Sequence, residues 1–148
     1  MTSTTEHGSA GIRAVAERTG LSVDTLRWYE REGLLPRVER GPDGRRRYDD
    51  AALGFLRLVQ ALRRGGMPVA EVRAFVRMSA EGAASHGRRM SLLERQRAAI
   101  RRQQARLAED LLTVEEKIAH YQDLIDRGLD CGGEPVDEAT AALQRRRC

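Results

Sequence analysis

The sequence of 148 residues contains little cysteine and no long apolar run. Its two cysteines, Cys131 and Cys148, lie near the C-terminus, which excludes a disulfide scaffold. No stretch approaches the ~20 apolar residues that span a bilayer. The polar N-terminal residues show no export-signal pattern. We therefore expect a cytoplasmic protein without a membrane anchor.

The residue combinations that enzymes and cofactor sites need are also missing. The three histidines, His7, His86 and His120, are scattered and have no clear nucleophile partner. No glycine-rich phosphate loop or dinucleotide loop is present. We expect neither an enzyme nor a bound metal or cofactor.

Lysine is almost absent: 25 of the 26 basic residues are arginine, and Lys117 is the exception. The planar guanidinium suits bidentate contacts with phosphates and base edges. A genome rich in G and C also favours arginine, and the formal net charge is only +4. The positions of the arginines must therefore decide whether nucleic acid is a partner.

Two short helices with a tight link are expected within residues 12–31. Apolar side chains of residues 12–19 share one helical face, and Gly20 permits the left-handed conformation that ends a helix. Ser22 then begins the second helix, because its hydroxyl can accept a hydrogen bond from an amide of the first turn. The pattern is typical of a helix-turn-helix, although an ordinary helical hairpin also fits.

A basic hairpin is expected next, over residues 36–48. The run Gly41-Pro42-Asp43-Gly44 is a turn cluster. Five arginines and two acids lie between Arg37 and Arg47. A short hairpin buries little, so these arginines face solvent or a partner. Beside a helix-turn-helix, they favour a wing that lies on the phosphate backbone of DNA.

Two further helices complete the expected DNA-binding domain. Asp49 or Asp50 caps the third, which ends at Gly65-Gly66, and Pro68 starts the fourth. The tail favours a short helix from Val136 to Arg145. The expected organisation is a disordered arm (1–10), a DNA-binding domain (11–78), a hinge of small residues (79–87), a long helix (88–127) and a C-terminal tail (128–148).

Residues 88–127 contain neither glycine nor proline and predict one helix of roughly 60 Å. Residues 88–106 hold seven arginines and one acid, whereas residues 107–127 hold six acids and two bases. An antiparallel partner places opposite charges alongside each other, and a parallel one places like charges together. An intramolecular hairpin would need a break that is absent. We therefore expect an antiparallel coiled-coil homodimer, whose seam follows three- and four-residue spacing through Leu93, Ile100, Leu107, Leu111, Val114, Ile118, Tyr121 and Ile125.

Together, these segments resemble the MerR family of bacterial transcription regulators. The resemblance is carried by IRAVAERTGLSVDTLRWYEREGLLP, GPDGRRRY and ALRRGGMPVAEVRAFV, and with the long helix it covers roughly residues 11–127. It implies a mainly α fold, with an N-terminal winged helix-turn-helix domain followed by a long antiparallel coiled-coil helix. It also implies a dimer that binds a palindromic operator within a promoter. Such a dimer distorts the promoter DNA so that RNA polymerase can engage it.

The resemblance assigns DNA contacts to three segments. The second helix supplies groove-facing side chains, although Tyr29 is equally suited to packing inward. From the charge of the hairpin, we expect Arg46 and Arg47 to contact phosphates rather than read bases. The full set comprises Ser22, Val23, Thr25, Arg27, Trp28 and Tyr29 in the helix, Arg37, Arg45, Arg46 and Arg47 in the wing, and Arg63 and Arg64 before Gly65.

The signal that the protein senses is not specified by the sequence. Metal-sensing members of the family carry a cysteine at the start of the long helix and a pair in the following loop. Here the start, MSLLERQ, has none, and Cys131 stands alone in its loop. Ala61 occupies the position where the thiol- and aldehyde-stress branch often has a cysteine. A Cys131 switch, a small ligand and constitutive DNA binding stay open, and so does a coiled-coil adaptor whose winged module binds another protein.

Overall fold

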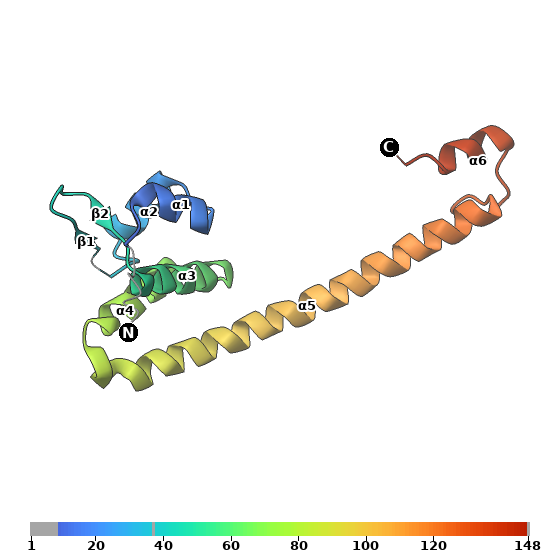
Figure 1. Cartoon of the computed structure of the whole chain (residues 1–148). Coiled ribbons are helices and arrows are strands. Elements are labelled where there is room, and N and C mark those ends of the chain that lie inside the picture. The colour runs from blue at the N-terminus through green and yellow to red at the C-terminus, as the bar shows by residue number, and fades with distance from the viewer. Residues whose placement is uncertain (1–8, 37, 148) are drawn as a thin grey trace, which may run out of the picture. The chain divides into compact units, whose positions relative to one another are not determined.

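The computed structural model describes residues 9–36 and 38–147 and divides into two compact units, up to Ile100 and from Arg101 onward. The structure is mainly helical, as predicted (Figure 1). Its elements are α1 (Ile12–Thr19), α2 (Val23–Arg31), β1 (Glu39–Arg40), β2 (Arg46–Arg47), α3 (Asp50–Arg64), α4 (Val69–Ser79), the 3-10 helix η1 (Gly82–Ser85), α5 (His86–Arg127) and α6 (Glu138–Gln144).

Local hydrogen bonds define the ends of the first helices. Gly20 ends α1 with a φ of 72°, and its N–H donates to the carbonyl of Ala16. The Ser22 hydroxyl accepts the N–H of Thr25 at 3.0 Å and caps α2. Asp49 caps α3 in the same way, by accepting the N–H of Ala52 at 2.7 Å. These caps confirm the predicted helix starts.

The hairpin pairs β1 with β2 in antiparallel register, Glu39 opposite Arg47. Next to it, Ala10 and Tyr48 exchange two backbone hydrogen bonds of 2.8 and 2.9 Å. Ala10 is buried, so it does not belong to a disordered arm as expected; the main-chain pairing with Tyr48 holds it in place. Residues 1–8 of that predicted arm lie outside the described residues.

The first unit has one apolar core, drawn from α1 to α4, the hairpin and the start of α5. Gln60 is a buried polar side chain of α3 and donates to the carbonyl of Thr19 at 3.1 Å. This bond satisfies a carbonyl at the C-terminus of α1 that has no partner within its own helix. Among the core side chains are Val15, Leu26, Tyr29, Leu34, Leu56, Val59, Val72 and Phe75.

The segment predicted as a flexible hinge, residues 79–87, is ordered into helical turns. It contains the end of α4, the 3-10 helix η1 and the start of α5 at His86, two residues before the predicted start. The side chain of Ser85 is fully buried; its hydroxyl donates to the carbonyl of Gly82 at 2.8 Å and accepts from Arg89 at 3.0 Å. Small residues permit this tight turn, which is why composition alone suggested a hinge.

The beginning of α5 packs on the first unit rather than standing free. Leu92 is buried in the core, and Leu93 packs against it. Gln96 donates to the carbonyl of Gly65 at 2.8 Å. Gly65 leaves room for Ile100, because a Cβ at Gly65 would lie 2.9 Å from the Ile100 side chain. Leu93 and Ile100, both predicted for the dimer seam, thus contact their own chain.

The second unit consists of the rest of α5 and a short folded tail. Gln144 of α6 donates to the carbonyl of Leu129 at 2.7 Å. Asp137 caps α6, which is shorter than the predicted span of 136–145. Among the described residues, no helix is both long and apolar enough to cross a membrane.

Candidate nucleic-acid interface

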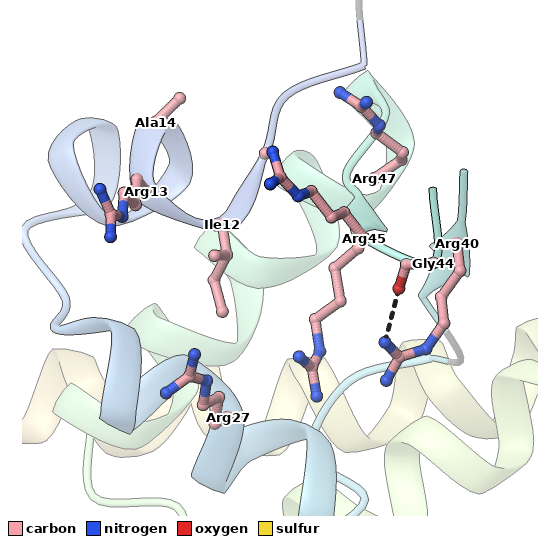
Figure 2. Close-up of a pocket in the computed structure, with 10 residues that line it drawn as sticks. Ile12, Arg13, Ala14, Arg27, Arg40, Gly44, Arg45 and Arg47 are labelled. Atoms are coloured by element: carbon pink, nitrogen blue, oxygen red, sulfur yellow. Dashed lines mark hydrogen bonds between the residues drawn. The ribbon is translucent and has the colours of Figure 1, made fainter. Parts of the chain in front are cut away.

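Arginines from three elements surround one hollow of about 710 Å³ in the first unit. Figure 2 shows guanidinium groups from α1, α2 and the hairpin around the same space. Among the described residues, its lining contains no acidic side chain and consists of Gly11, Ile12, Arg13, Ala14, Arg27, Arg40, Gly44, Arg45, Arg46 and Arg47. Six positive charges around one hollow favour a polyanion as its occupant.

The first turn of α1 adds to this positive potential. Gly11 is its N-cap and offers no side-chain cap, and no acidic residue lies in the first turn. The N–H groups of a first helical turn have no partner within the helix, and the helix dipole is positive there. Ile12, Arg13 and Ala14 line the hollow, so this end of α1 borders the space that the arginines surround.

The predicted contact residues of α2 divide into an exposed and a buried group. Ser22 and Arg27 are exposed, and Val23 and Thr25 are half-buried. Trp28 is among the exposed large apolar side chains. Tyr29, by contrast, lies in the core, with its ring centroid 5.6 Å from that of Trp28. Of the two roles considered for Tyr29, the structure shows inward packing.

The wing arginines also differ in their surroundings. The side chain of Arg45 is 84% exposed and lies 3.8 Å from Asp43. Arg47 reaches the same carboxylate at 3.5 Å, and its side chain is 42% exposed. Arg40 donates to the carbonyl of Gly44 at 2.9 Å, the bond drawn in Figure 2. Arg37 lies outside the described residues.

Arg46 is the inward-facing member of the wing. Its Nε donates to the Glu30 carboxylate of α2, and the two side chains are only 23% and 25% exposed. Tyr48 is buried nearby, and burial, followed by the charge of Glu30, raises the pKa of its phenol, while Arg46 opposes that rise. The phenol therefore stays neutral at any physiological pH. Sequence reasoning missed this role of Glu30, although the residue stands in the run Arg27-Trp28-Tyr29-Glu30 that carried the resemblance.

The two arginines before Gly65 are held by backbone carbonyls. Arg63 donates to the carbonyl of Met67 at 2.8 Å and so closes the link between α3 and α4. Arg64 donates to the carbonyl of Gln60 at 3.4 Å and is the more exposed of the two. The link therefore presents Arg64 to a partner more readily than Arg63.

The second unit exposes an apolar row along α5. Leu107, Leu111, Val114, Ile118 and Tyr121 are all exposed, and they occupy consecutive positions of the predicted seam. Ile125, the last seam position, is half-buried within its own unit. Cys131 is exposed, and Cys148 lies outside the described residues. Within the part of the chain that the structure describes, no three His, Cys, Asp or Glu side chains are grouped for a metal ion.

Comparisons with known proteins agree with this architecture. The family model described as MerR HTH family regulatory protein matches residues 11–79, and the model described as MerR, DNA binding matches residues 54–110. An uncharacterised HTH-type transcriptional regulator of Haemophilus influenzae is 39% identical over 107 residues, which covers 72% of this chain and 79% of that protein. The regulator AdhR of Bacillus subtilis is 34% identical over 88 residues, with 58% and 63% covered.

A solved structure shows the same fold on DNA. It is the crystal structure of HiNmlR, described as a MerR family regulator lacking the sensor domain, bound to promoter DNA. Its TM-score to this chain is 0.74 at 36% sequence identity, and the match covers 81% of this chain and 95% of that one.

Proposed function

Because the chain belongs to the MerR family and is a transcriptional regulator with a DNA-binding domain, we propose that it acts as a homodimer on a palindromic operator within a promoter. By distorting that DNA it changes how RNA polymerase engages the promoter. It works in the cytoplasm, on the nucleoid, where such promoters are found. Its homologues are transcriptional regulators, and we propose no enzymatic activity for it.

The observation that carries this proposal is the arginine-lined hollow between α1, α2 and the hairpin. A duplex offers a closely spaced row of phosphates, and each phosphate neutralised by an arginine releases counterions. The exposed guanidinium groups of Arg45 and Arg47 on the hairpin are suited to such contacts, and α2 is suited to the major groove. Backbone contacts position the domain, while side chains of α2 read base edges.

The dimer is supported by the exposed row on α5. Five large apolar side chains in seam positions face solvent in one chain, and a second copy can cover them. The basic residues 88–106 and the acidic residues 107–127 favour the antiparallel arrangement. A two-fold dimer presents two copies of α2 and therefore matches an operator whose half-sites are related by the same symmetry.

The decisive experiment is a gel shift and footprint with the intact protein on the DNA immediately upstream of its own gene, titrated over a range of salt concentrations. We expect protection of a palindromic site and an affinity that falls steeply as salt rises. An unrelated duplex of equal length serves as the DNA control. Equal affinity for both duplexes would contradict operator binding and would favour the protein-binding adaptor.

Arg45→Ala and Arg47→Ala test the hollow itself. Each should weaken binding to both duplexes and lower the magnitude of the salt slope by about one for every phosphate that the variant no longer neutralises. Arg77→Ala is a matched control, because Arg77 is an exposed arginine of α4 that does not line the hollow. An equal decrease of the slope in Arg77→Ala would show that general charge, rather than the hollow, binds the DNA.

A further inference from the structure

Among the described wing arginines, Arg46 is the least exposed of those in ion pairs, and its partner lies on another element. Arg46 of β2 and Glu30 of α2 are separated by 16 residues in sequence, yet their side chains form an ion pair. Both are about three-quarters buried, whereas neighbouring Arg45 is 84% exposed. The same basic run thus contains one arginine that joins two elements and another that is available to a partner.

We propose that Arg46 is a positioning residue: it fastens the wing to the helix that reads DNA, through Glu30, and does not itself neutralise a phosphate. This inference rests on the proposed DNA-binding function and assigns different roles to residues of the same site. Glu30 is then a part of the DNA-binding apparatus, although it carries the charge that DNA repels.

The physical basis is the arrangement of a very short hairpin. Its two strands have two residues each and are joined to each other by few hydrogen bonds. Such a ribbon is only marginally stable without packing. Ala10 pairs with Tyr48 at its base, and the ion pair from Arg46 to Glu30 supplies a side-chain link to α2. A charge-assisted bond with low exposure holds its geometry better than a solvated surface pair.

Releasing Arg46 to a phosphate would leave the Glu30 carboxylate without its cation in a poorly solvated place. Tyr48 is buried nearby, but its hydroxyl makes no hydrogen bond with any described residue, so Arg46 is the group that holds the Glu30 carboxylate in this structure. An unpaired buried charge is costly, so the pair opposes that exchange. Arg45 and Arg47 can turn to a phosphate at far smaller cost, since the carboxylate that each of them approaches belongs to Asp43, which is itself exposed.

The direction in which Glu30→Ala changes DNA affinity distinguishes a positioning role of Arg46 from a direct phosphate contact. Glu30→Ala removes a negative charge from a DNA-binding surface, and simple electrostatics then predicts tighter binding. If Arg46 and Glu30 hold the wing in place, the same substitution weakens binding instead. Asp24→Ala is the matched control, because Asp24 is an exposed acid on the same helix whose ion pair, with Arg27, joins no second element. The Asp24→Ala variant should bind DNA as tightly as the unaltered protein or more tightly.

The experiment measures affinity and salt slope for the intact protein on the upstream duplex and on an unrelated duplex of equal length. We expect Arg46→Gln and Glu30→Ala each to weaken binding about tenfold, the scale of one charge-assisted hydrogen bond. Neither should change the salt slope, whereas Arg45→Gln should lower it by about 0.9. Thermal unfolding of each variant checks that the domain is folded.

The charge-swapped double variant Glu30→Arg with Arg46→Glu completes the test. It restores the pair in reverse and should recover most of the affinity that either single swap loses. A slope lowered by about one in Arg46→Gln, with no rescue in the double variant, would show that Arg46 binds phosphate directly and would overturn the inference. If the unaltered protein still prefers the upstream duplex in that case, the proposed function stands. The proposed function is contradicted when the unaltered protein binds neither duplex or binds both with equal affinity.

Discussion

The two units of this chain use the same kinds of side chain with opposite results. In the first, Leu56 and Val59 of α3 are completely buried among α1, α2 and α4. In the second, Leu107 is 67% exposed, and the four seam positions that follow it are exposed as well. Both helices have regularly spaced apolar residues. Whether these apolar side chains are buried depends on whether other elements of the chain pack against them.

The difference follows from how much chain is available. The first unit has four short helices and a hairpin that close around one core. The second has one helix and a short tail, which is too little to enclose a continuous apolar row. Each large side chain left in water forgoes roughly 1.5–3 kcal/mol of burial. A partner helix of the same sequence would recover much of this.

The strongest test of the comparison is to abolish the apolar row in the second unit. Leu111→Asp combined with Ile118→Asp should convert the protein to monomers, because two charges would be buried in the seam. Operator affinity should fall by about a hundredfold, as expected when two linked half-sites become independent. Sedimentation equilibrium and the footprint measure the two effects.

Leu112→Asp controls for the loss of an exposed leucine. Leu112 is equally open to solvent but lies off the three- and four-residue spacing of the seam. It should leave the dimer intact. An unchanged dimer in the double variant would show that the row is covered by something other than a second α5.

A smaller effect is expected where α5 packs on the first unit. In Gly65→Ala, the new Cβ would lie 2.5 Å from Gln96 Nε2 and 2.9 Å from the Ile100 side chain. The backbone there has a φ of −74°, which alanine accepts, so crowding alone is tested. We expect the free energy of unfolding to fall by about 1–3 kcal/mol, measured by urea denaturation.

Gly54→Ala, inside the helix α3 that Gly65 caps, is the matched control. No atom lies within 4 Å of a Cβ at Gly54, and alanine favours a helix interior over glycine. This variant should raise the free energy of unfolding by about 0.5–1 kcal/mol. Equal stabilisation of both variants would contradict the close packing of α5 against Gly65.

A local effect is expected at α6, the small folded tail of the second unit. The pKa of Asp137 is lowered from 3.8 because its carboxylate accepts hydrogen bonds from Thr140. The cap therefore stabilises α6 above the pKa of the unfolded chain and is lost as pH falls through the lower folded value. NMR Cα shifts of α6 should move toward coil below pH 3.8. Asp137→Ala should show the coil shifts already at neutral pH, whereas Glu138→Ala should not.

No effect is expected at Cys131. The structure shows it exposed, and the sequence has no second cysteine within the spacing of a metal loop. Cys131→Ser should leave the zinc and copper content of the purified protein unchanged, as measured by elemental analysis. Stoichiometric zinc in the unaltered protein that disappears in the serine variant would prove this wrong.

Much of the fold could be predicted because its signals are local. Ser22 and Asp49 cap helices by hydrogen bonds to an N–H three residues away, and Gly20 ends α1 through its own backbone conformation. Such interactions join residues only a few positions apart, so the local sequence is enough to predict them. The prediction of a hinge at residues 79–87 was wrong because the order of this segment depends on contacts beyond it. Its composition is flexible, but the burial of Ser85 depends on the surrounding packing.

The candidate site was predicted only as far as composition reaches. Arginines in a hairpin beside two helices predict a surface for phosphates, and in the structure six arginine side chains line one hollow there. Composition treats Arg45, Arg46 and Arg47 alike, because they are adjacent and chemically identical. The alternation of a strand and the position of Glu30 on another element separate them. The sequence likewise does not decide whether Tyr29 packs inward or contacts DNA, because an amphipathic side chain on a short helix suits either face.

By itself, the sequence determined the order of helices, their caps, the basic hairpin and an apolar row with segregated charge, because each depends on spacing along one element. Tertiary structure alone decided which members of these patterns are available. Leu93 and Ile100 pack on their own domain while Leu107 and Leu111 stay exposed. Arg46 binds Glu30 while Arg45 faces solvent. A periodic pattern names the side chains that share a face, but only the distance to other elements decides what covers them.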